Sequence, residues 1–286
     1  MFMTSAYRSQ AGAEQVQDWC RAALARWVVP HQTHLVDTSL GMTHVVSLGA
    51  GDNVCVYLPG TNFNASSSLT VLAALAGKFR VYAADLPGQP GLSAANRPAD
   101  EHSGYARWVT QLIGWVARRD GRARILLAGH SRGAAVALSA KPDTVHGLAL
   151  FSPAGLIAVR PTLTMLRSTV PWLVRRNAVD ARRLLDYMSG PGGVPAADLV
   201  EWMTIVARAC RTTGAPGPLP DTDLDRWKGH NVRVAVGEHD VFFPIPKLHE
   251  ACRAKLNLEP LVVPGAGHLL VDEEPELTAD MVAGLA

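Results

Sequence analysis

Ser131 is the residue whose surroundings most clearly suggest chemistry. It is the centre of AGHSRGAA, a G-x-S-x-G match between the apolar run RILLA and an alanine-rich segment. Glycine on either side permits a sharp turn from a strand into a helix, which would expose the hydroxyl at the helix N-terminus. Such a serine becomes a nucleophile when an imidazole takes its proton and a carboxylate orients that imidazole. The motif also fits an ordinary turn serine, so the surrounding elements decide.

Apolar strands and helices alternate through the middle of the chain. Strands are predicted over residues 53–60, 80–88, 123–130 and 146–156. Helices are predicted between them, over 66–77, 105–121 and 131–140. This alternation is typical of a parallel sheet with helices on both faces, an α/β fold. Upstream, residues 34–39 and 42–48 predict an antiparallel hairpin at the sheet edge, preceded by a helix over about 14–27.

The alternation stops after the fourth of these strands. Only helical stretches follow, over 162–177, 180–190 and 196–211, separated by Pro- and Gly-rich breaks. Strands resume at 231–240 and 258–268, and a short terminal helix ends the chain. We therefore predict a core domain made of residues 1–157 and 231–286, interrupted by a helical cap at 158–230.

The strand, the G-x-S-x-G turn and the helix together resemble the α/β-hydrolase fold family, and the resemblance covers nearly the whole chain. In that family the nucleophile, the acid and the histidine follow in this order, each at the C-terminal end of a strand. The resemblance implies Ser131 as nucleophile, Asp240 of GEHDVFFP as acid and His268 of GAGHLL as base. Glu238 is an alternative acid, although the spacing favours Asp240. His249 also follows the acid but is expected on a helix surface.

The same resemblance implies an oxyanion hole formed by two backbone N–H groups. One comes from Arg132, directly after the nucleophile, and the other from Thr61 in YLPGTNFN, with the side chain of Asn62 assisting. Many relatives begin this loop with His-Gly, whereas this sequence has Pro59 before Gly60. The guanidinium of Arg132 is expected to pair either with a nearby carboxylate or with an acidic group of the substrate.

The walls of the substrate pocket are harder to predict. Leu156, Trp172, Trp202 and Met203 are candidates, although a tryptophan or methionine on a helix is more often ordinary core. Residues 85–93, DLPGQPGLS, are similar to a structural segment of the family and are assigned no chemistry.

The predicted cap contains a cluster of arginines with only Asp180 and Asp186 to offset them nearby. The cluster fits either an ordinary solvated helix face or a basic rim that attracts an anionic or carrier-bound acyl substrate. Its members are Arg160, Arg167, Arg175, Arg176, Arg182 and Arg183.

The composition restricts the partners and the compartment. The net charge is +2, which gives no basic field for nucleic acid. No apolar run is long enough to span a bilayer, and the N-terminal stretch lacks the apolar centre of a signal peptide. Cys20, Cys55, Cys210 and Cys252 form no C-x-x-C pair, which indicates free, mostly buried thiols in a reducing cytoplasm. We expect a cytoplasmic protein that needs neither a metal nor a cofactor and contacts no membrane.

The function that the resemblance implies is serine hydrolysis of an ester, lactone or thioester through an acyl-enzyme. Two alternatives stay open. The same fold and triad can serve C–C bond hydrolysis or lyase chemistry, or the protein can be a small-molecule receptor without turnover.

Overall fold

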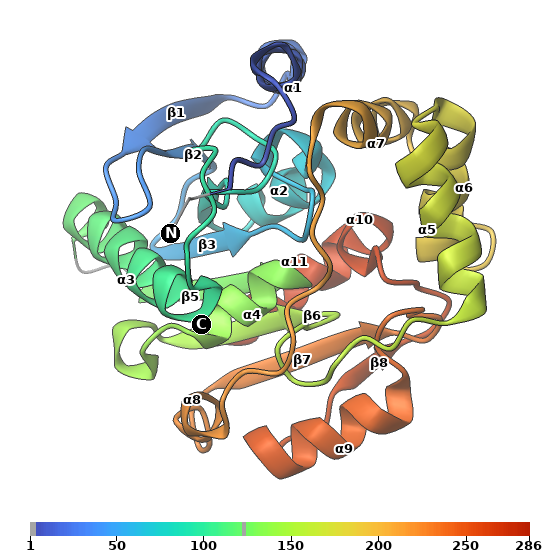
Figure 1. The fold of residues 1–286 in the computed structure, drawn as a ribbon. Helices are drawn as coiled ribbons and strands as arrows, with labels where there is room; N and C mark the ends of the chain where they lie inside the picture. The colour runs from blue at the N-terminus through green and yellow to red at the C-terminus, as the bar shows by residue number, and fades with distance from the viewer. Residues whose placement is uncertain (1–3, 122–123) are drawn as a thin grey trace.

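The computed structural model describes residues 4–121 and 124–286. The first residue of the strand predicted over 123–130, and the first three residues of the N-terminal stretch, lie outside this part. The described chain forms one sheet with helices on both faces, and a further group of helices lies to one side of it (Figure 1).

The sheet is mostly parallel, as the sequence predicts. Its strands are β1 (His31–Val36), β2 (Thr43–Leu48), β3 (Asn53–Leu58), β4 (Arg80–Ala84), β5 (Arg124–His130), β6 (Gly147–Phe151), β7 (Val232–Gly237) and β8 (Leu261–Val263). Within the described residues their order is β1-β2-β4-β3-β5-β6-β7-β8. β2 pairs antiparallel with both β1 and β4, and the other neighbours pair in parallel. The predicted antiparallel hairpin at the edge is therefore confirmed.

The helices follow the predicted alternation, with shifted ends. They are α1 (Gln10–Arg26), α2 (Leu69–Ala76), α3 (Glu101–Asp120), α4 (Arg132–Leu138), α5 (Leu163–Arg175), α6 (Ala178–Met188), α7 (Ala197–Ala209), α8 (Asp221–Asp225), α9 (Ile245–Leu256), α10 (Leu270–Glu273) and α11 (Pro275–Ala283). α3 begins before residue 105 because the carboxylate of Asp100 accepts hydrogen bonds from the N–H groups of His102 and Ser103. No helix of the described chain is both long and apolar enough to cross a membrane.

Both faces of the sheet are buried, because neighbouring side chains of a strand point to opposite faces. On β3, Val54 and Val56 pack in one apolar cluster together with residues of α3, α4 and α9. Cys55 and Tyr57 belong to the opposite cluster, which includes residues of α2 and α11. This explains the continuous apolar runs from which the parallel strands were predicted.

The cysteines are buried and carry free thiols, as predicted. Burial raises the pKa of Cys55, Cys210 and Cys252 to about 12. These thiols therefore stay protonated near neutral pH and are poor nucleophiles.

Helices α5 to α8 lie between β6 and β7, and we call this segment, residues 158–230, the helical insertion. Its helices α5, α6 and α7 gather beside the sheet (yellow to gold in Figure 1). α1 packs against α7, where the rings of Trp19 and Trp202 lie 4.7 Å apart. A side chain at Gly12 would come within 3.2 Å of the Ala209 side chain, so the two backbones approach closely. The sequence did not predict this contact, and the division of the chain into a core and a cap stays a prediction.

Candidate active site

Ser131 occupies the sharp turn between β5 and α4. Its backbone has φ 50° and ψ −111°, a left-handed φ that is costly for a residue with a side chain. A Cβ at Gly129 would lie 2.5 Å from the carbonyl oxygen of Gly133, and one at Gly133 would lie 2.0 Å from that of Leu58. Glycine is therefore required on both sides of Ser131, which is the physical content of the G-x-S-x-G spacing.

Ser131, His268 and Asp240 form a continuous chain of hydrogen bonds. The Oγ of Ser131 lies 3.2 Å from Nε2 of His268, and Nδ1 of His268 lies 2.9 Å from Oδ2 of Asp240. Because a carboxylate only accepts, Nδ1 carries the proton in this pair and Nε2 is free to accept from the serine hydroxyl. The structure thus brings together the three residues that the sequence nominated, in a geometry suited to proton transfer.

Asp240 is fixed by its own backbone turn. Its Oδ1 accepts hydrogen bonds from the N–H groups of Phe242, at 2.8 Å, and Phe243, at 2.9 Å. Burial acts to raise the pKa of Asp240, but the facing His268 and the hydrogen bonds outweigh it and hold this pKa below its ordinary value. The carboxyl is therefore ionised at neutral pH and can stabilise a positive imidazole.

The alternative acid and base lie elsewhere. The side chain of Glu238 is half exposed and accepts a hydrogen bond from the N–H of Gly265 at 3.0 Å. His249 lies on α9, where its Nδ1 is 2.9 Å from Oε2 of Glu259. Neither side chain forms a hydrogen bond or ion pair with Ser131 or His268 in the described part of the chain.

The loop before His268 is joined to the helical insertion by one carboxylate. Oε1 of Glu273 accepts from the N–H of Gly190 at 2.6 Å, and Oε2 accepts from the N–H of Gly267 at 2.7 Å. Gly190 follows the end of α6 and Gly267 precedes His268, so Glu273 bridges the two segments. Sequence reasoning missed Glu273, because nothing in the local pattern distinguishes it from other acidic residues of a terminal helix.

His130, the last residue of β5, supports the same loop next to the sharp turn at Ser131, which we call the elbow. Its Nε2 lies 2.8 Å from the carbonyl oxygen of His268 and donates to it, and the two rings lie 5.2 Å apart. Burial, and then the neighbouring His268, lower the pKa of His130 to about 3. His130 is therefore neutral near physiological pH.

The loop after β3 brings Thr61 to the elbow. A Cβ at Gly60 would lie 3.4 Å from the Cβ of Ser131, which shows how closely the two segments approach. The N–H of Asn62 donates to Oε1 of Gln89 at 3.2 Å. By contrast, the N–H groups of Thr61 and Arg132 have no intramolecular partner among residues 4–121 and 124–286. These two groups remain available for an oxyanion.

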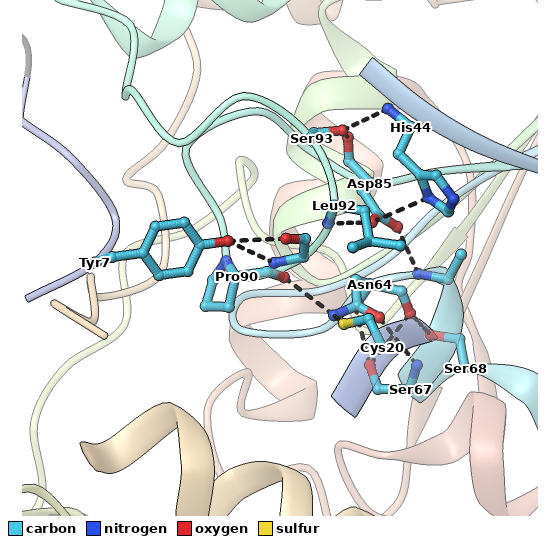
Figure 2. A network of polar contacts seen from close by, with 12 residues as sticks. Tyr7, Cys20, His44, Asn64, Ser67, Ser68, Asp85, Pro90, Leu92 and Ser93 are labelled. Carbon is cyan, nitrogen blue, oxygen red and sulfur yellow. Dashed lines mark hydrogen bonds and ion pairs between the residues drawn. The ribbon is translucent and has the colours of Figure 1, made fainter. Parts of the chain in front are cut away.

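A buried polar network around Asp85 holds this loop from behind (Figure 2). Oδ1 of Asp85 accepts from the N–H of Ala65 at 2.8 Å, and Oδ2 accepts from the N–H of Leu92 at 2.9 Å. Asn64 donates from Nδ2 to the carbonyl oxygen of Pro90 at 3.1 Å. Asp85 therefore ties the loop after β3 to residues 85–93, which accounts physically for the structural role expected of that segment.

A cavity of about 480 Å³ opens onto Ser131 and His268. Three of the residues expected near the substrate, Asn62, Trp172 and Met203, line it. The ring of Phe242 stands edge-on to the His268 ring with the centroids 4.6 Å apart. Other lining residues that the sequence did not nominate include Met165, Met188, Phe243 and residues 212–215. Only Phe242 and Phe243 carried a signal, because they lie two and three residues after Asp240.

Two expected wall residues lie elsewhere. Leu156 is fully buried in the apolar cluster beneath α3 and α4 and does not line the cavity. Trp202, on α7, is buried against Trp19 of α1, and its Nε1 donates to the carbonyl oxygen of Asn62 at 2.8 Å. Trp202 therefore supports the loop after β3 from outside the cavity. Both side chains are buried as expected, but they point into the packed core and not into the cavity.

The arginines divide into two groups. Nη1 of Arg132 donates to Oε2 of Glu101 at 2.7 Å, which is the nearby carboxylate of the first expectation. In the helical insertion, Arg175 and Arg183 both contact Asp180, at 2.6 and 3.2 Å, and Arg182 lies 3.9 Å from Asp186. Arg160, Arg167 and Arg176 form no ion pair within the described residues.

In the same residues, no cluster of His, Cys, Asp or Glu could hold a metal ion.

The chain is similar in sequence and in fold to known hydrolases. A model of the alpha/beta hydrolase family matches residues 55–281. The carboxylesterase YbfK of Bacillus subtilis (strain 168) is 25% identical over 269 residues, which cover 89% of this chain and 87% of that protein. The structure of naproxen esterase from Bacillus subtilis matches with a TM-score of 0.77 at 20% identity, over 97% of this chain and 99% of that one. A putative hydrolase from Bacillus subtilis matches with a TM-score of 0.80 at 20% identity, over 96% and 99%.

Proposed function

The chain belongs to the alpha/beta hydrolase family, and we propose that it is a serine carboxylesterase. The observation that carries the proposal is the hydrogen-bonded chain from Ser131 through His268 to Asp240 at the wall of the cavity. The similarity to a protein named carboxylesterase and to a naproxen esterase favours an ester over a lactone or thioester.

In the proposed reaction, Oγ of Ser131 attacks the ester carbonyl while Nε2 of His268 takes the hydroxyl proton. The C–O bond to the alcohol then breaks, and the alcohol leaves with that proton. Water repeats the sequence on the acyl-enzyme, which releases the acid and restores the serine. Asp240 keeps its negative charge throughout and stabilises the imidazolium, which fits its lowered pKa.

The unpartnered N–H groups of Thr61 and Arg132 are the proposed oxyanion hole. Charge develops on the carbonyl oxygen during attack, and preorganised donors stabilise that charge more than the neutral ester. Asn62 lines the cavity beside Thr61 and is proposed to assist with its side chain.

The acyl group is proposed to lie under the helical insertion, which acts as a cap. Met165, Trp172, Met188 and Met203 come from α5, α6 and α7 and give the cavity an apolar wall. Its volume of about 480 Å³ fits a small-molecule ester. An apolar wall next to the nucleophile favours an aliphatic or aromatic acyl group.

The test is turnover of nitrophenyl esters from acetyl to octanoyl, combined with labelling by a fluorophosphonate. The protein should hydrolyse the esters and be labelled once, and Ser131→Ala should lose both activities, with kcat lower by about 10⁴ or more. Residual full activity in a folded Ser131→Ala variant would remove the nucleophile from the proposal. Labelling without ester turnover would favour C–C bond chemistry or a receptor.

A further inference from the structure

The side chain of Arg132 is among the largest buried groups of the protein, with 1% of the residue exposed. Three of its nitrogens donate to three different segments. Nε lies 3.3 Å from Oγ1 of Thr61, Nη1 lies 2.7 Å from Oε2 of Glu101, and Nη2 donates to Oγ1 of Thr213 at 2.9 Å and to the carbonyl oxygen of Gly214 at 2.7 Å. A buried guanidinium is costly unless it is paired and hydrogen-bonded. This one is paired with Glu101 and forms four hydrogen bonds through Nε, Nη1 and Nη2.

The segment that Nη2 holds forms one wall of the cavity. Residues 212–215 line the cavity, and they belong to a stretch from Arg211 to Pro220 that has neither helix nor strand. A Cβ added at Gly214 or at Gly217 would have no atom within 4 Å, so packing braces the stretch little at these points. In the described structure, the bonds from Arg132 are the hydrogen bonds that hold Thr213 and Gly214.

The same guanidinium reaches the other side of the nucleophile. Thr61, whose hydroxyl accepts from Nε, carries one of the two unpartnered N–H groups beside Ser131. The second of these N–H groups is that of Arg132 itself. One side chain therefore connects the two proposed oxyanion donors with the wall that faces the substrate.

The geometry requires arginine and not merely a positive charge. Glu101 alone could be satisfied by lysine, but a guanidinium presents donors in a fixed planar fork, whereas an ammonium is a compact point charge. A lysine placed on Glu101 would leave the acceptors on Thr61, Thr213 and Gly214 without their donor.

We propose that the side chain of Arg132 is a positioning residue that fixes Thr61 in the oxyanion hole and residues 212–215 in the cavity wall. The proposal rests on the serine hydrolase function proposed above. The sequence left the choice for this guanidinium between a neighbouring carboxylate and an acidic substrate group. Its burial and its hydrogen bonds to Thr61, Glu101, Thr213 and Gly214 assign it to the protein's own architecture.

Two variants separate the effect of the hydrogen-bond geometry of Arg132 from the effect of its ion pair with Glu101. Arg132→Lys keeps the positive charge beside Glu101 but loses the planar set of donors. Glu101→Gln removes the negative charge of the partner but keeps an acceptor for Nη1. Active sites are first counted by fluorophosphonate labelling, so that unfolded protein does not enter the comparison. The readouts are kcat and KM for a nitrophenyl ester, and the affinities for a trifluoromethyl ketone and the corresponding methyl ketone. The trifluoromethyl ketone forms a tetrahedral adduct that needs the oxyanion hole.

Per active site, Arg132→Lys should lower kcat by about tenfold to a hundredfold, because loosening a donor costs less than removing it. It should weaken the trifluoromethyl ketone by a similar factor and the methyl ketone much less. Glu101→Gln should stay within about threefold of the unmodified protein in both readouts, since the fork keeps its partners. A positioning role is overturned if Arg132→Lys binds both ketones as the unmodified protein does, or if Glu101→Gln is as damaging. The proposed serine chemistry fails separately, through activity in Ser131→Ala.

Discussion

The N–H of His268 donates to the carbonyl oxygen of Met188, the last residue of α6, at 2.7 Å. The proposed base is therefore bonded through its backbone to the helical insertion. The contact is close because the residue before the base is a glycine. A Cβ at Gly267 would lie 2.4 Å from the same carbonyl oxygen. We therefore expect a displacement of α6 to shift the imidazole through this backbone contact as well as through the bridge that Glu273 forms.

We predict that Gly267→Ala lowers kcat although the substitution touches no reacting atom. The added methyl must push Met188 or the loop aside, at a cost of about 1–3 kcal/mol in stability and with displacement of His268. Gly217→Ala is the matched control, because a Cβ there would meet no atom within 4 Å. Steady-state kinetics and thermal unfolding of both variants test this. Equal activity of the two variants would refute the coupling.

The base assignment predicts a particular pH profile. A protonated imidazole cannot accept the serine proton, so kcat/KM should fall as the solution is taken from neutral to moderately acidic pH. His130 cannot produce this limb, because its pKa of about 3 keeps it neutral there. Asp240, whose pKa is lowered, stays ionised there and cannot produce it either.

His268→Ala should abolish turnover, whereas His249→Ala should leave both kcat and the profile unchanged. His249, on α9, pairs with Glu259, and neither residue lines the cavity. Rate measurements from acidic to neutral pH on both variants decide the assignment. An inactive His249→Ala with an active His268→Ala would reverse it.

Thr61 is predicted to act through its N–H. Thr61→Ser keeps both the N–H and the hydroxyl that accepts from Arg132, so it should be close to the unmodified protein. Thr61→Ala keeps the N–H but loses the hydroxyl through which Arg132 holds it, so it should lower kcat by less than Arg132→Lys does, at a cost of about 1 kcal/mol. Thr61→Pro removes the donor and should lower kcat by about 10² to 10³. Circular dichroism establishes that the variants are folded, and an active, folded proline variant would place the second donor elsewhere.

The basic rim, one of the two interpretations of the arginine cluster, predicts that turnover of anionic esters depends on Arg160. Arg160 is exposed, forms no ion pair in the described chain, and lies between Val159 and Pro161, which both line the cavity. Arg160→Glu should lower kcat/KM for an ester that carries a carboxylate and leave a neutral ester unchanged, and added salt should act in the same direction. Arg167→Glu, a neighbouring exposed position on α5, is the control. Equal responses of charged and neutral esters in all variants would leave these arginines as ordinary surface.

Most of the fold was predictable because it depends on local patterns. Runs such as the one in β5 are apolar throughout, and a helix follows each of them, which favours a parallel sheet. Gly129 and Gly133 are required because an added Cβ would lie 2.5 or 2.0 Å from a backbone oxygen, so the turn at Ser131 can be recognised in the sequence. The proposed catalytic residues could be predicted because Ser131, Asp240 and His268 follow in the order that the family resemblance implies.

The remaining features were not predictable because they depend on contacts between distant segments. Trp19 stacks on Trp202 and Glu273 bridges Gly190 and Gly267, and no local period encodes either pairing. Leu156 was misplaced for a related reason. Burial can be read from hydrophobicity, but the direction in which a buried side chain points depends on how the helices pack above it.

The left-handed φ of Ser131 strains the backbone at the proposed nucleophile, and this strain lowers the free energy of unfolding. A backbone strained in this way costs about 1–3 kcal/mol, and glycine would relieve it while losing about 0.4–1 kcal/mol through the greater freedom of its unfolded chain. Ser131→Gly should therefore melt at a higher temperature than Ser131→Ala, although both lack the hydroxyl. Differential scanning calorimetry of the pair measures the difference, and equal melting temperatures would mean that the turn is unstrained. If the difference is found, the nucleophile occupies a turn whose strain lowers the stability of the folded chain, and a glycine at this position would avoid that cost only by losing the hydroxyl.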